Sequence, residues 1–560
     1  MAESALSSQV STHQRKRFRL LDLRESLTGC LFVLPAFIII GVFGLFPIGF
    51  AVYVSLHKWR INPTRFAGLE NYANSLDDLA YVVFFWVVVI LLFLAGRNAV
   101  KLVKDARERK ENPWPWLLPA LVTAVGIEEF IRFVVLLLPE VLGIADKVRG
   151  VERTRELFVR LLVEAWRTPA AQSTLRISLL LFLVALILAY VAYRLTSKAS
   201  HNITYYTSWL TVLLLTGGAF ALGWFTWIEI ERAYQVALEA GESLEIWTQV
   251  ITISAGFLLL FLSWLSWRGA SHRASNLGMI LRLIAAAMLA IAAWVLVAEL
   301  PRVIAAGDAD WWQGLKVTVY YSVGTVPLQL GISLVLATLL FQNIKGRSLY
   351  RLIYFLPYIT PTVAAAAIFR VFFSARPSAP INNLLSQFGI DPLLWLAEPK
   401  GIVELIAGPD ASLPGWAVGP SLALVVIIIY NIWSYVGYDT VIFLAGLGGI
   451  PSELYEAAAI DGAGRWAQFR NITLPLLSPT TYFLTLLAII GTFKAFNHVW
   501  VLRFAAALGT TDTASIVIFT EFNRNTRYGY AASLSLVLLG VILVLTVINN
   551  RVAEERVFYG

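Results

Sequence analysis

The sequence YEAAAIDGAGRWAQFRNITLPLLSP, Tyr455–Pro479, is a polar and alanine-rich stretch between two long apolar segments. It holds carboxylates at Glu456 and Asp461 and guanidinium groups at Arg465 and Arg470. The apolar segments before and after it are each long enough for a helix to cross a bilayer, which takes about 20 residues. The stretch is therefore predicted to be a loop on one side of a membrane, between two spans.

The loop itself is predicted to fold as two short helices. Ser452 is a suitable N-cap for a helix over 453–461. Gly462 suits the end of that helix, because glycine adopts a positive φ without strain. A second short helix over 465–472 leads to Pro475, which is expected in the first turn of the next span. The result is a helix-turn-helix at the membrane surface with a carboxylate on its exposed side.

The composition of the whole chain agrees with a membrane protein. Of 560 residues, 58% are hydrophobic and 14% are charged, whereas soluble proteins have about 25% charged residues. Since backbone groups in lipid must be hydrogen-bonded within their own segment, the apolar segments are predicted to be helices. The fold class is therefore all-α and polytopic. About twelve spans are expected, over 29–55, 79–96, 115–139, 174–194, 205–228, 248–267, 278–299, 314–341, 352–373, 418–446, 478–500 and 528–549.

Basic residues predict the orientation of these spans. The N-terminal segment 1–28 is rich in arginine, which places it in the cytoplasm. Alternation of the spans then places the basic loop 97–113, the polar loop 451–475 and the C-terminal segment 552–560 on the same side. The net charge of +8 thus reflects membrane orientation, and no nucleic-acid partner is expected.

Charged residues fit this scheme poorly in two places. The loop 140–173 falls on the outer side yet carries mixed basic and acidic residues, so we expect an amphipathic helix on the membrane surface. The span 115–139 holds Glu128, Glu129 and Arg132 near its middle, where charges are costly. Glu128 and Arg132 are spaced to pair on one helix face. A structural pair and a polar functional site are the two interpretations of this group.

The polar loop also carries an ordered set of residues with fixed gaps. Three residues separate Ala458 from Gly462, and nine separate Gly462 from Ile472. The full set is Glu456, Ala457, Ala458, Asp461, Gly462, Ile472, Leu474 and Pro475. It resembles the EAA loop of binding-protein-dependent ABC importer permeases. Pro451 before the set and Pro479 after it are similar to the carbohydrate-uptake subfamily, of the maltose and glycerol-phosphate type.

Other segments resemble the same family and divide the chain. The resemblance covers 29–78 and 308–551, which would form a six-helix permease core. An insert over 79–307, of about six spans, interrupts that core and has no counterpart in the usual pattern. An even number of added spans leaves and returns on the same side, so the core keeps its orientation. The family usually has a Gly-Gly-Pro turn where this chain reads VLRFAAALGTTDTAS, 501–515. For the insert, lateral packing or a partner surface is favoured over a second transport pathway.

The resemblance implies that the loop is a coupling helix that docks into a groove on a separate ATPase, with Glu456 facing a basic residue there. The chain lacks a phosphate-binding loop of the Gly-x-x-x-x-Gly-Lys-Ser/Thr type. ATP and magnesium are therefore expected on a partner ATPase dimer, with no cofactor, metal ligand or catalytic residue on this chain. The family also implies a second permease subunit, an extracytoplasmic solute-binding protein and a carbohydrate substrate. The expected location is the inner membrane of a bacterial or archaeal cell, in contact with membrane lipid, with both termini cytoplasmic.

A substrate pathway is expected where polar side chains of the core spans converge near the bilayer midplane. Amides can hydrogen-bond sugar hydroxyls, and aromatic rings can stack on sugar faces. The candidates are Asn431, Trp433, Ser434, Tyr435 and Tyr438 on the span 418–446, and Asn497 and His498 on the span 478–500. Lys494 would favour an acidic substrate or extend to the interface. For each single residue, hydrogen bonding between helices is an equally good interpretation.

Two other functions are alternatives. An ion-coupled secondary transporter would also suit twelve spans, but it needs matching halves and an intramembrane carboxylate relay. Matching halves are not seen, and the clearest buried carboxylates, Glu128 and Glu129, are expected in the insert. A membrane glycosyltransferase would need an acidic pair in an outer loop beside an early span, and Asp77-Asp78 is a weak match.

Overall fold

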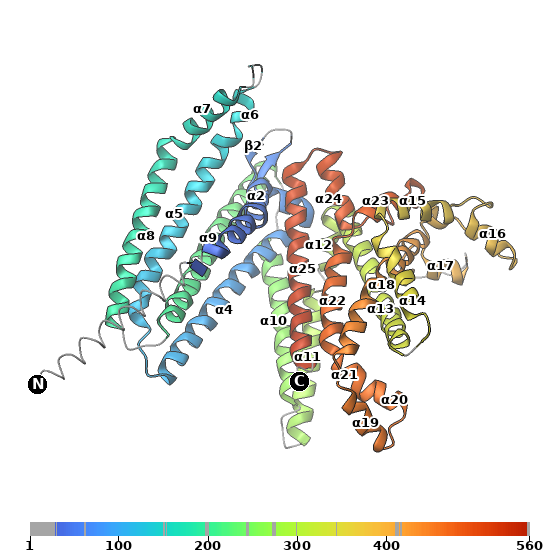
Figure 1. Cartoon of the computed structure of the whole chain (residues 1–560). Helices are drawn as coiled ribbons and strands as arrows, with labels where there is room; N and C mark the ends of the chain where they lie inside the picture. Colours follow the sequence, from blue (N-terminus) through green and yellow to red (C-terminus); the bar gives the residue numbers. More distant parts are fainter. Residues whose placement is uncertain are drawn as a thin grey trace, which may run out of the picture. The chain divides into compact units, whose positions relative to one another are not determined.

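The computed structural model describes residues 28–29, 31–60, 63–148, 150, 152, 154–196, 201–241, 246–270, 276–297, 300–342, 344–408, 414 and 417–556. Within this part the chain is almost entirely helical (Figure 1), so the all-α polytopic fold class is confirmed. The sheet within it is a hairpin of β1 (His57–Trp59) and β2 (Pro63–Phe66), with His57 opposite Phe66. The basic residues of 1–27 and the end of the C-terminal segment lie outside the described residues.

The chain divides into two compact units. Unit 1 consists of Met1–Ser75 and Asp308–Gly560, and unit 2 of Leu76–Gly307. The predicted insert 79–307 falls within unit 2. Each unit is built from its own set of helices.

Unit 1 begins with a long apolar helix over Leu31–Ser55, and the short helix α3 follows the hairpin. The helices of unit 1, with η marking π- and 3-10 helices, are η1 (Gly41–Leu45), α2 (Phe46–Ser55), α3 (Glu70–Leu76), α13 (Ala309–Phe341), α14 (Arg347–Ile359), α15 (Thr362–Phe372), α16 (Pro380–Ser386), η3 (Trp395–Ala397), α17 (Ile402–Ala407), α18 (Leu422–Gly448), α19 (Ser452–Ile460), α20 (Arg465–Gln468), η4 (Phe469–Thr473), α21 (Leu474–Leu476), α22 (Ser478–Phe493), α23 (Asn497–Leu502), η5 (Ala505–Ala507), α24 (Ala514–Asn523) and α25 (Tyr528–Arg556). In Figure 1, α19 and α20 lie at the lower end of this unit, and β2 and α24 lie toward the upper end.

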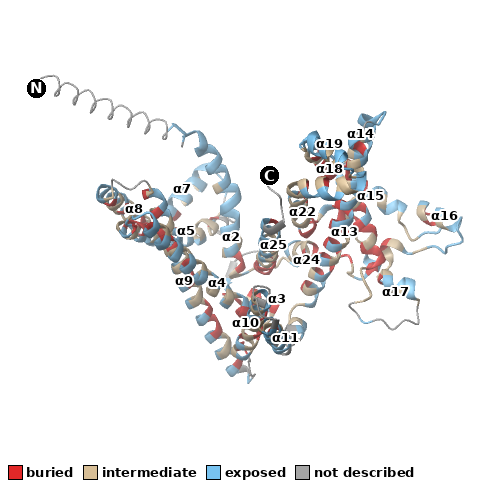
Figure 2. Ribbon diagram, turned by 90° about the horizontal axis from the view of Figure 1, so that it is seen from below, coloured by how far each residue is buried: buried red, intermediate tan, exposed pale blue. Residues whose placement is uncertain are grey.

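The core of unit 1 lies between α13 and α18, which carry more buried residues than any other helix of the unit (Figure 2). Tyr321 of α13 and Leu424 and Ile427 of α18 belong to one buried hydrophobic cluster. Small hydroxyl residues let the two helices approach each other, as is common between helices in membranes. Ser333 of α13 donates to the carbonyl of Val436 on α18, at 3.1 Å.

Unit 2 is a set of long helices packed in pairs. α4 packs against α9, α5 against α8, and α10 against α11. Side-chain hydroxyls join two of these pairs, from Ser178 to the carbonyl of Gly126 and from Ser263 to the carbonyl of Ala286. The bounds are α4 (Leu79–Glu108), η2 (Trp114–Trp116), α5 (Leu117–Leu142), α6 (Ile144–Lys147), α7 (Arg155–Trp166), α8 (Pro169–Leu195), α9 (Asn202–Ala240), α10 (Ile246–Ala270), α11 (Asn276–Val297) and α12 (Leu300–Ala306).

The part of the chain that the structure describes has fewer helices that qualify as membrane spans than the twelve predicted. Among the described residues, nine helices are long and apolar enough to cross a membrane, or up to eleven if each bent pair forms one span. The predicted span 115–139 forms the continuous helix α5, but its charged residues keep it out of that number. The figure of twelve therefore stays a prediction.

Two predicted spans are not straight helices. The span 352–373 breaks into α14 and α15, which meet at an angle of 95°. Pro361 explains this break, because a proline lacks an N–H and its ring forces the preceding residue out of the helical region. The span 478–500 is bent by 62° against Arg465–Leu476 at its start and ends at Phe493. Asn497 therefore begins a separate short helix, α23, and does not continue that span.

The charged residues of unit 2 form other contacts than those expected. Arg132 pairs with Glu129, with Nη1 at 3.5 Å from Oε1, so the predicted pair with Glu128 is wrong. The spacing of three residues serves as well as four on a helix surface. The loop 140–173 does contain a helix, α7, which Thr154 caps by accepting from the N–H of Leu157. A position of α7 on the membrane surface stays a prediction.

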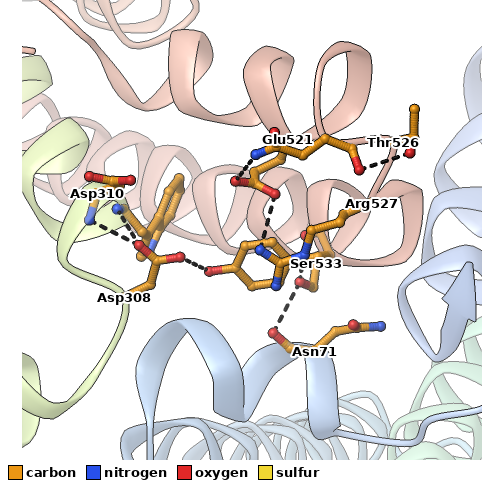
Figure 3. Close-up of polar contacts among 10 residues, drawn as sticks. Asn71, Asp308, Asp310, Glu521, Thr526, Arg527 and Ser533 are labelled. Atoms are coloured by element: carbon orange, nitrogen blue, oxygen red, sulfur yellow. Dashed lines mark hydrogen bonds and ion pairs between the residues drawn. The ribbon is translucent and has the colours of Figure 1, made fainter. Parts of the chain in front are cut away.

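The two ends of unit 2 leave unit 1 at neighbouring backbone groups. The N–H of Asp308 donates to the carbonyl of Ser75 at 3.3 Å. Asp308 also caps α13, where Oδ1 accepts from the N–H groups of Asp310 and Trp311, and its Oδ2 accepts from the hydroxyl of Tyr530 on α25 (Figure 3). Hydrogen bonds within unit 1 therefore hold Ser75 and Asp308 together, at the two positions between which unit 2 is inserted.

This closure predicts that unit 1 folds without unit 2. Removing Leu76–Gly307 and joining Ser75 to Asp308 through a short glycine linker should leave a monodisperse membrane protein. A cysteine placed at Ala459, in a Cys30→Ser background, should be labelled only after the membrane is made permeable. Labelling of intact cells at Ala459, or aggregation of the shortened chain, would contradict the prediction.

Candidate functional site

The helix α19 begins one residue away from the predicted position. Pro451 has an extended backbone, with φ −60° and ψ 133°, and Ser452 is already the first helical residue. Ser452 therefore is not the N-cap, and the N-cap position has no side-chain hydrogen bond. Proline itself sets the start, because its ring fixes φ and the extended ψ turns the chain into the helix.

The end of α19 is as predicted. Gly462 has φ +82°, in the left-handed region. The N–H of Ala463 donates to the carbonyl of Ala458 at 2.8 Å, and the N–H of Gly462 donates to the carbonyl of Ala459 at 3.1 Å. These two bonds form a Schellman motif, which satisfies the last carbonyls of the helix. Any β-branched residue at Gly462 would be strained by this backbone conformation.

Side chains hold α19 against the segment that follows it. The hydroxyl of Tyr455 lies 3.0 Å from Oγ1 of Thr473. The amide of Gln468 donates to the carbonyls of Tyr455 and Ala463, both at 3.3 Å. Thr473 is buried, whereas the tip of the loop is not. The loop is therefore a fixed two-helix projection from the core.

The outer face of this projection is exposed and partly apolar. Ile460 is 87% exposed and Trp466 is 72% exposed. Glu456 is exposed on the same helix, and within the described residues its carboxylate forms no ion pair. A face that combines large apolar side chains with an unpaired charge is typical of a protein–protein contact.

The remaining coupling candidates belong to the same projection. Ala457, Asp461, Leu474 and Pro475 are exposed, and Ala458 and Ile472 are half-buried. Pro475 lies in α21, before the bend, so its predicted place in the first turn of the span is wrong. Pro479 occupies that place, at the start of α22.

Asn431 lies inside the helix bundle and not on an open surface. Its amide donates to Oε1 of Gln329 at 3.0 Å, and the amide of Gln329 donates to Oδ2 of Asp439 at 2.7 Å. All three side chains are buried. This network joins α13 to α18 across the core, which corresponds to the interpretation as hydrogen bonding between helices.

His498 also contacts other helices. Its Nε2 lies 2.7 Å from the hydroxyl of Tyr321, and its ring stacks on Tyr430 with 5.2 Å between centroids. His498 and Tyr321 are buried. Tyr430 donates to the carbonyl of Thr362, at the start of α15. The His498 side chain thus joins α23 to α13 and α18.

An aromatic surface forms on the other side of α18. Tyr438 stacks on Tyr358 of α14 with 4.6 Å between centroids, and Tyr435 meets the same ring edge-on at 5.7 Å. Gly437 allows this approach, because a Cβ there would lie 1.7 Å from the carbonyl oxygen of Tyr354. Trp433 is exposed and packs on Phe369 of α15, at 5.1 Å. These rings suit the stacking expected for a sugar.

The remaining candidates for the substrate pathway, Ser434, Asn497 and Lys494, lie outside the aromatic surface. Ser434 is buried on α18. Asn497 is exposed at the start of α23, and Lys494 is exposed in the break before it. Asn497 forms no side-chain hydrogen bond within the described residues. It is therefore the amide candidate that is free to meet a ligand.

Several residues of the site were missed by the sequence reading. Gln329, Tyr321 and Tyr358 lie in other predicted spans, and their partners on α18 and α23 are distant in sequence. Asp439 is 4% exposed, which makes it the clearest buried carboxylate in unit 1. The expectation that Glu128 is a clear buried carboxylate is wrong, because its side chain is exposed on α5. An acidic residue within the apolar segment 418–446 was the signal that could have identified Asp439.

Comparison with known proteins gives consistent matches for this part of the chain. Residues 329–556 match the family described as binding-protein-dependent transport system inner membrane component. The probable ABC transporter permease protein YesP of Bacillus subtilis is 32% identical over 256 residues, which cover 45% of this chain and 75% of that protein. The lactose transport system permease protein LacF of Rhizobium radiobacter is 32% identical, over 44% of this chain and 78% of that protein.

An archaeal protein and a solved structure match over a similar extent. The trehalose/maltose transport system permease protein MalF of Thermococcus litoralis is 29% identical, over 44% of this chain and 76% of that protein. A chain of the bacterial alginate ABC transporter, solved with an alginate pentasaccharide-bound periplasmic protein, is 25% identical. That likeness covers 44% of this chain and 80% of that chain, with a TM-score of 0.38.

The two amide candidates should behave differently on substitution. Asn431→Ala leaves Oε1 of Gln329 buried without its donor, which costs about 1–3 kcal/mol. We expect a lower thermal unfolding temperature in detergent for that variant. Asn497→Ala should change stability by less than about 0.5 kcal/mol, as for other exposed residues, and should weaken uptake. Equal stability of both variants would contradict the role assigned to the network.

Proposed function

Because this chain belongs to the inner membrane components of binding-protein-dependent transport systems, we propose that it imports a carbohydrate with energy from a separate ATPase that docks on the loop Pro451–Pro475. The general role follows from the family. The chain is a permease subunit of a carbohydrate importer and a multi-pass protein of the inner membrane. The proposals below concern how the loop couples to the ATPase, which substrate is carried and which partners assemble with the chain.

One observation carries the coupling role. The EAA-like residues belong to a two-helix projection, joined by the hydrogen bonds of Tyr455 and Gln468, whose exposed residues include an unpaired carboxylate and large apolar side chains. Glu456 supplies the charge, and Ile460 and Trp466 supply apolar area. In a partly buried contact, a basic group of the ATPase would meet Glu456, and removing one partner of such a pair costs about 3–5 kcal/mol. ATP and magnesium bind to that ATPase dimer in this proposal.

The substrate proposal is a sugar or a related glycoside. The names of the relatives include lactose, trehalose/maltose, sn-glycerol-3-phosphate and arabinooligosaccharide transport. The aromatic surface of Tyr358, Tyr435, Tyr438 and Trp433, with Asn497 elsewhere in unit 1, offers stacking and amide groups of the kind that sugars need. The remaining proposed partners are a second permease subunit and an extracytoplasmic solute-binding protein, and the name of the family supports the binding protein.

An ion-coupled mechanism is the second candidate, and Asp439 favours it. This buried carboxylate lies in the core of unit 1, where a proton relay would be placed. Its hydrogen bond from Gln329, which in turn bonds Asn431, supports a structural role instead. Uptake by proteoliposomes that hold the whole complex distinguishes the two. We expect uptake with ATP and none with a proton or sodium gradient alone.

The coupling role predicts that two variants lose ATP-dependent uptake while the chain still inserts. Glu456→Lys places a positive charge against the basic partner group, and Gly462→Val strains the helix end at φ +82°. We expect uptake into vesicles to fall below about a tenth of wild type, which is an effect of about 1.4 kcal/mol or more. Co-purification of the ATPase tells loss of docking from loss of coupling.

The matched control for the glycine variant is Gly464→Val. Gly464 lies in the same loop with φ −69°, which valine adopts without strain, and a Cβ there has no heavy atom within 4 Å. This control should keep at least half of the wild-type uptake. Normal uptake by both Glu456→Lys and Gly462→Val would refute the coupling role.

A further inference from the structure

Unit 2 contains a cavity between α4 and α9 that several polar side chains line, with a volume of about 280 Å³. A single water needs about 10–15 Å³ of such space, so the cavity can hold a larger group. From α4 and the residue after it come Asn98, Lys101, Leu102, Asp105 and Arg109, and from α9 come Thr204, Tyr205, Ser208 and Thr211. Neither the coupling loop nor the aromatic surface of unit 1 includes any of these residues.

Two hydroxyl groups of the cavity are free to donate. Most threonines of α9 donate to a carbonyl of their own helix, namely Thr207, Thr211, Thr216 and Thr226. Thr204 and Ser208 do not, and both line the cavity. Within the described residues, the Asn98 amide also forms no side-chain hydrogen bond. Three neutral donors therefore lack partners inside one cavity.

The charges of the cavity favour a monovalent anion. Lys101 and Arg109 contribute two positive charges and Asp105 one negative charge, which leaves one net positive charge. Neither Lys101 nor Arg109 forms an ion pair within the part of the chain that the structure describes. A metal ion would meet two cations there, whereas a phosphate group would meet donors that match its oxygens.

The wall of the cavity is fixed by hydrogen bonds that do not use these donors. The hydroxyl of Tyr205 donates to Oε2 of Glu111 at 2.7 Å, so Tyr205 offers its ring to the cavity and not its hydroxyl. Trp116 donates to Oδ1 of Asn202, and Trp209 donates to the carbonyl of Pro113. The ends of α4 and α9 are thus held in place around the cavity.

The position along α4 is that of a membrane interface. The apolar part of α4 covers 79–96, and basic and acidic residues follow it. At a rise of 1.5 Å per residue, that part is about 27 Å long, close to the thickness of the hydrocarbon core. Trp114, Trp116 and Trp209 lie at the same end, as in an aromatic belt. A group bound in the cavity is therefore at headgroup level.

We propose that this cavity binds the phosphate group of an anionic phospholipid headgroup. Lys101 and Arg109 neutralise the charge of the phosphodiester, and Asn98, Thr204 and Ser208 donate to its oxygens. Basic pockets between membrane helices at this depth are suited to such headgroups. A free phosphate ion has the same chemistry, so the test must separate the two sources.

The test measures lipid binding to the purified full chain in detergent by native mass spectrometry. Titration with dioleoyl-phosphatidylglycerol should give binding at least tenfold tighter than titration with dioleoyl-phosphatidylcholine. The double variant Lys101→Gln with Arg109→Gln should weaken phosphatidylglycerol binding about thirtyfold. Each basic residue near a membrane surface contributes about 1 kcal/mol, and 1.4 kcal/mol corresponds to tenfold. Ser208→Ala should weaken it by a smaller factor.

The matched control is Arg107→Gln with Lys110→Gln, which removes the same charge at the same end of α4 but outside the cavity. It should change binding by less than threefold. Equal binding by wild type and the Lys101/Arg109 variant, or an equal loss in the control, would overturn the site. Inorganic phosphate that binds as tightly as the lipid, and depends on Lys101 and Arg109, would assign the site to a soluble phosphate.

Discussion

The hydrogen bond from Gln329 to Asp439 joins the two most buried helices of unit 1. In lipid, helices gain no hydrophobic energy by leaving their solvent, so packing and hydrogen bonds must hold them together. Gln329 has both of its amide groups engaged, with Asp439 on one side and Asn431 on the other. Such a network stabilises the core only when every member is paired. The register of α13 against α18 is thereby set, and α14, α22 and α24 pack on one or both of these two helices.

The same helix α18 connects the two proposed functional surfaces. Its exposed face carries the aromatic side chains that meet α14 and α15, and its C-terminal end leads through Pro451 into α19. α18 has no interior proline and a buried stripe along its length. A force on the projecting loop would therefore reach the aromatic surface through one continuous helix. The bend between α14 and α15 lies beside that surface, and Tyr430 holds it by bonding the carbonyl of Thr362.

The sequence predicted the helical class, the end of α19 at Gly462 and the segment pattern of the family because these depend on local chemistry. Apolar length predicts a helix in lipid, and glycine favours a left-handed turn, wherever they occur. The breaks were missed, because Pro361 stands within an apolar segment that is long enough for a straight span, and because no proline marks the break after Phe493. The partner of Arg132 was wrong, because spacings of three and four are equally good on a helix. The site was predicted only in part, since Asn431 and His498 have polar partners on helices that are distant in sequence.

The hydrogen bond between Ser75 and Asp308 also has a practical consequence. The two ends of the intervening segment are held as neighbours by unit 1 itself, through the capped start of α13 and the Tyr530 hydroxyl. The entropy of closing a chain between fixed ends grows slowly, by about 0.6 kcal/mol for each doubling of its length. The stability of unit 1 should therefore depend only weakly on the length of the chain inserted between Ser75 and Asp308. We therefore expect this junction to accept a fluorescent reporter or an affinity epitope, carried on the permease without extending either terminus.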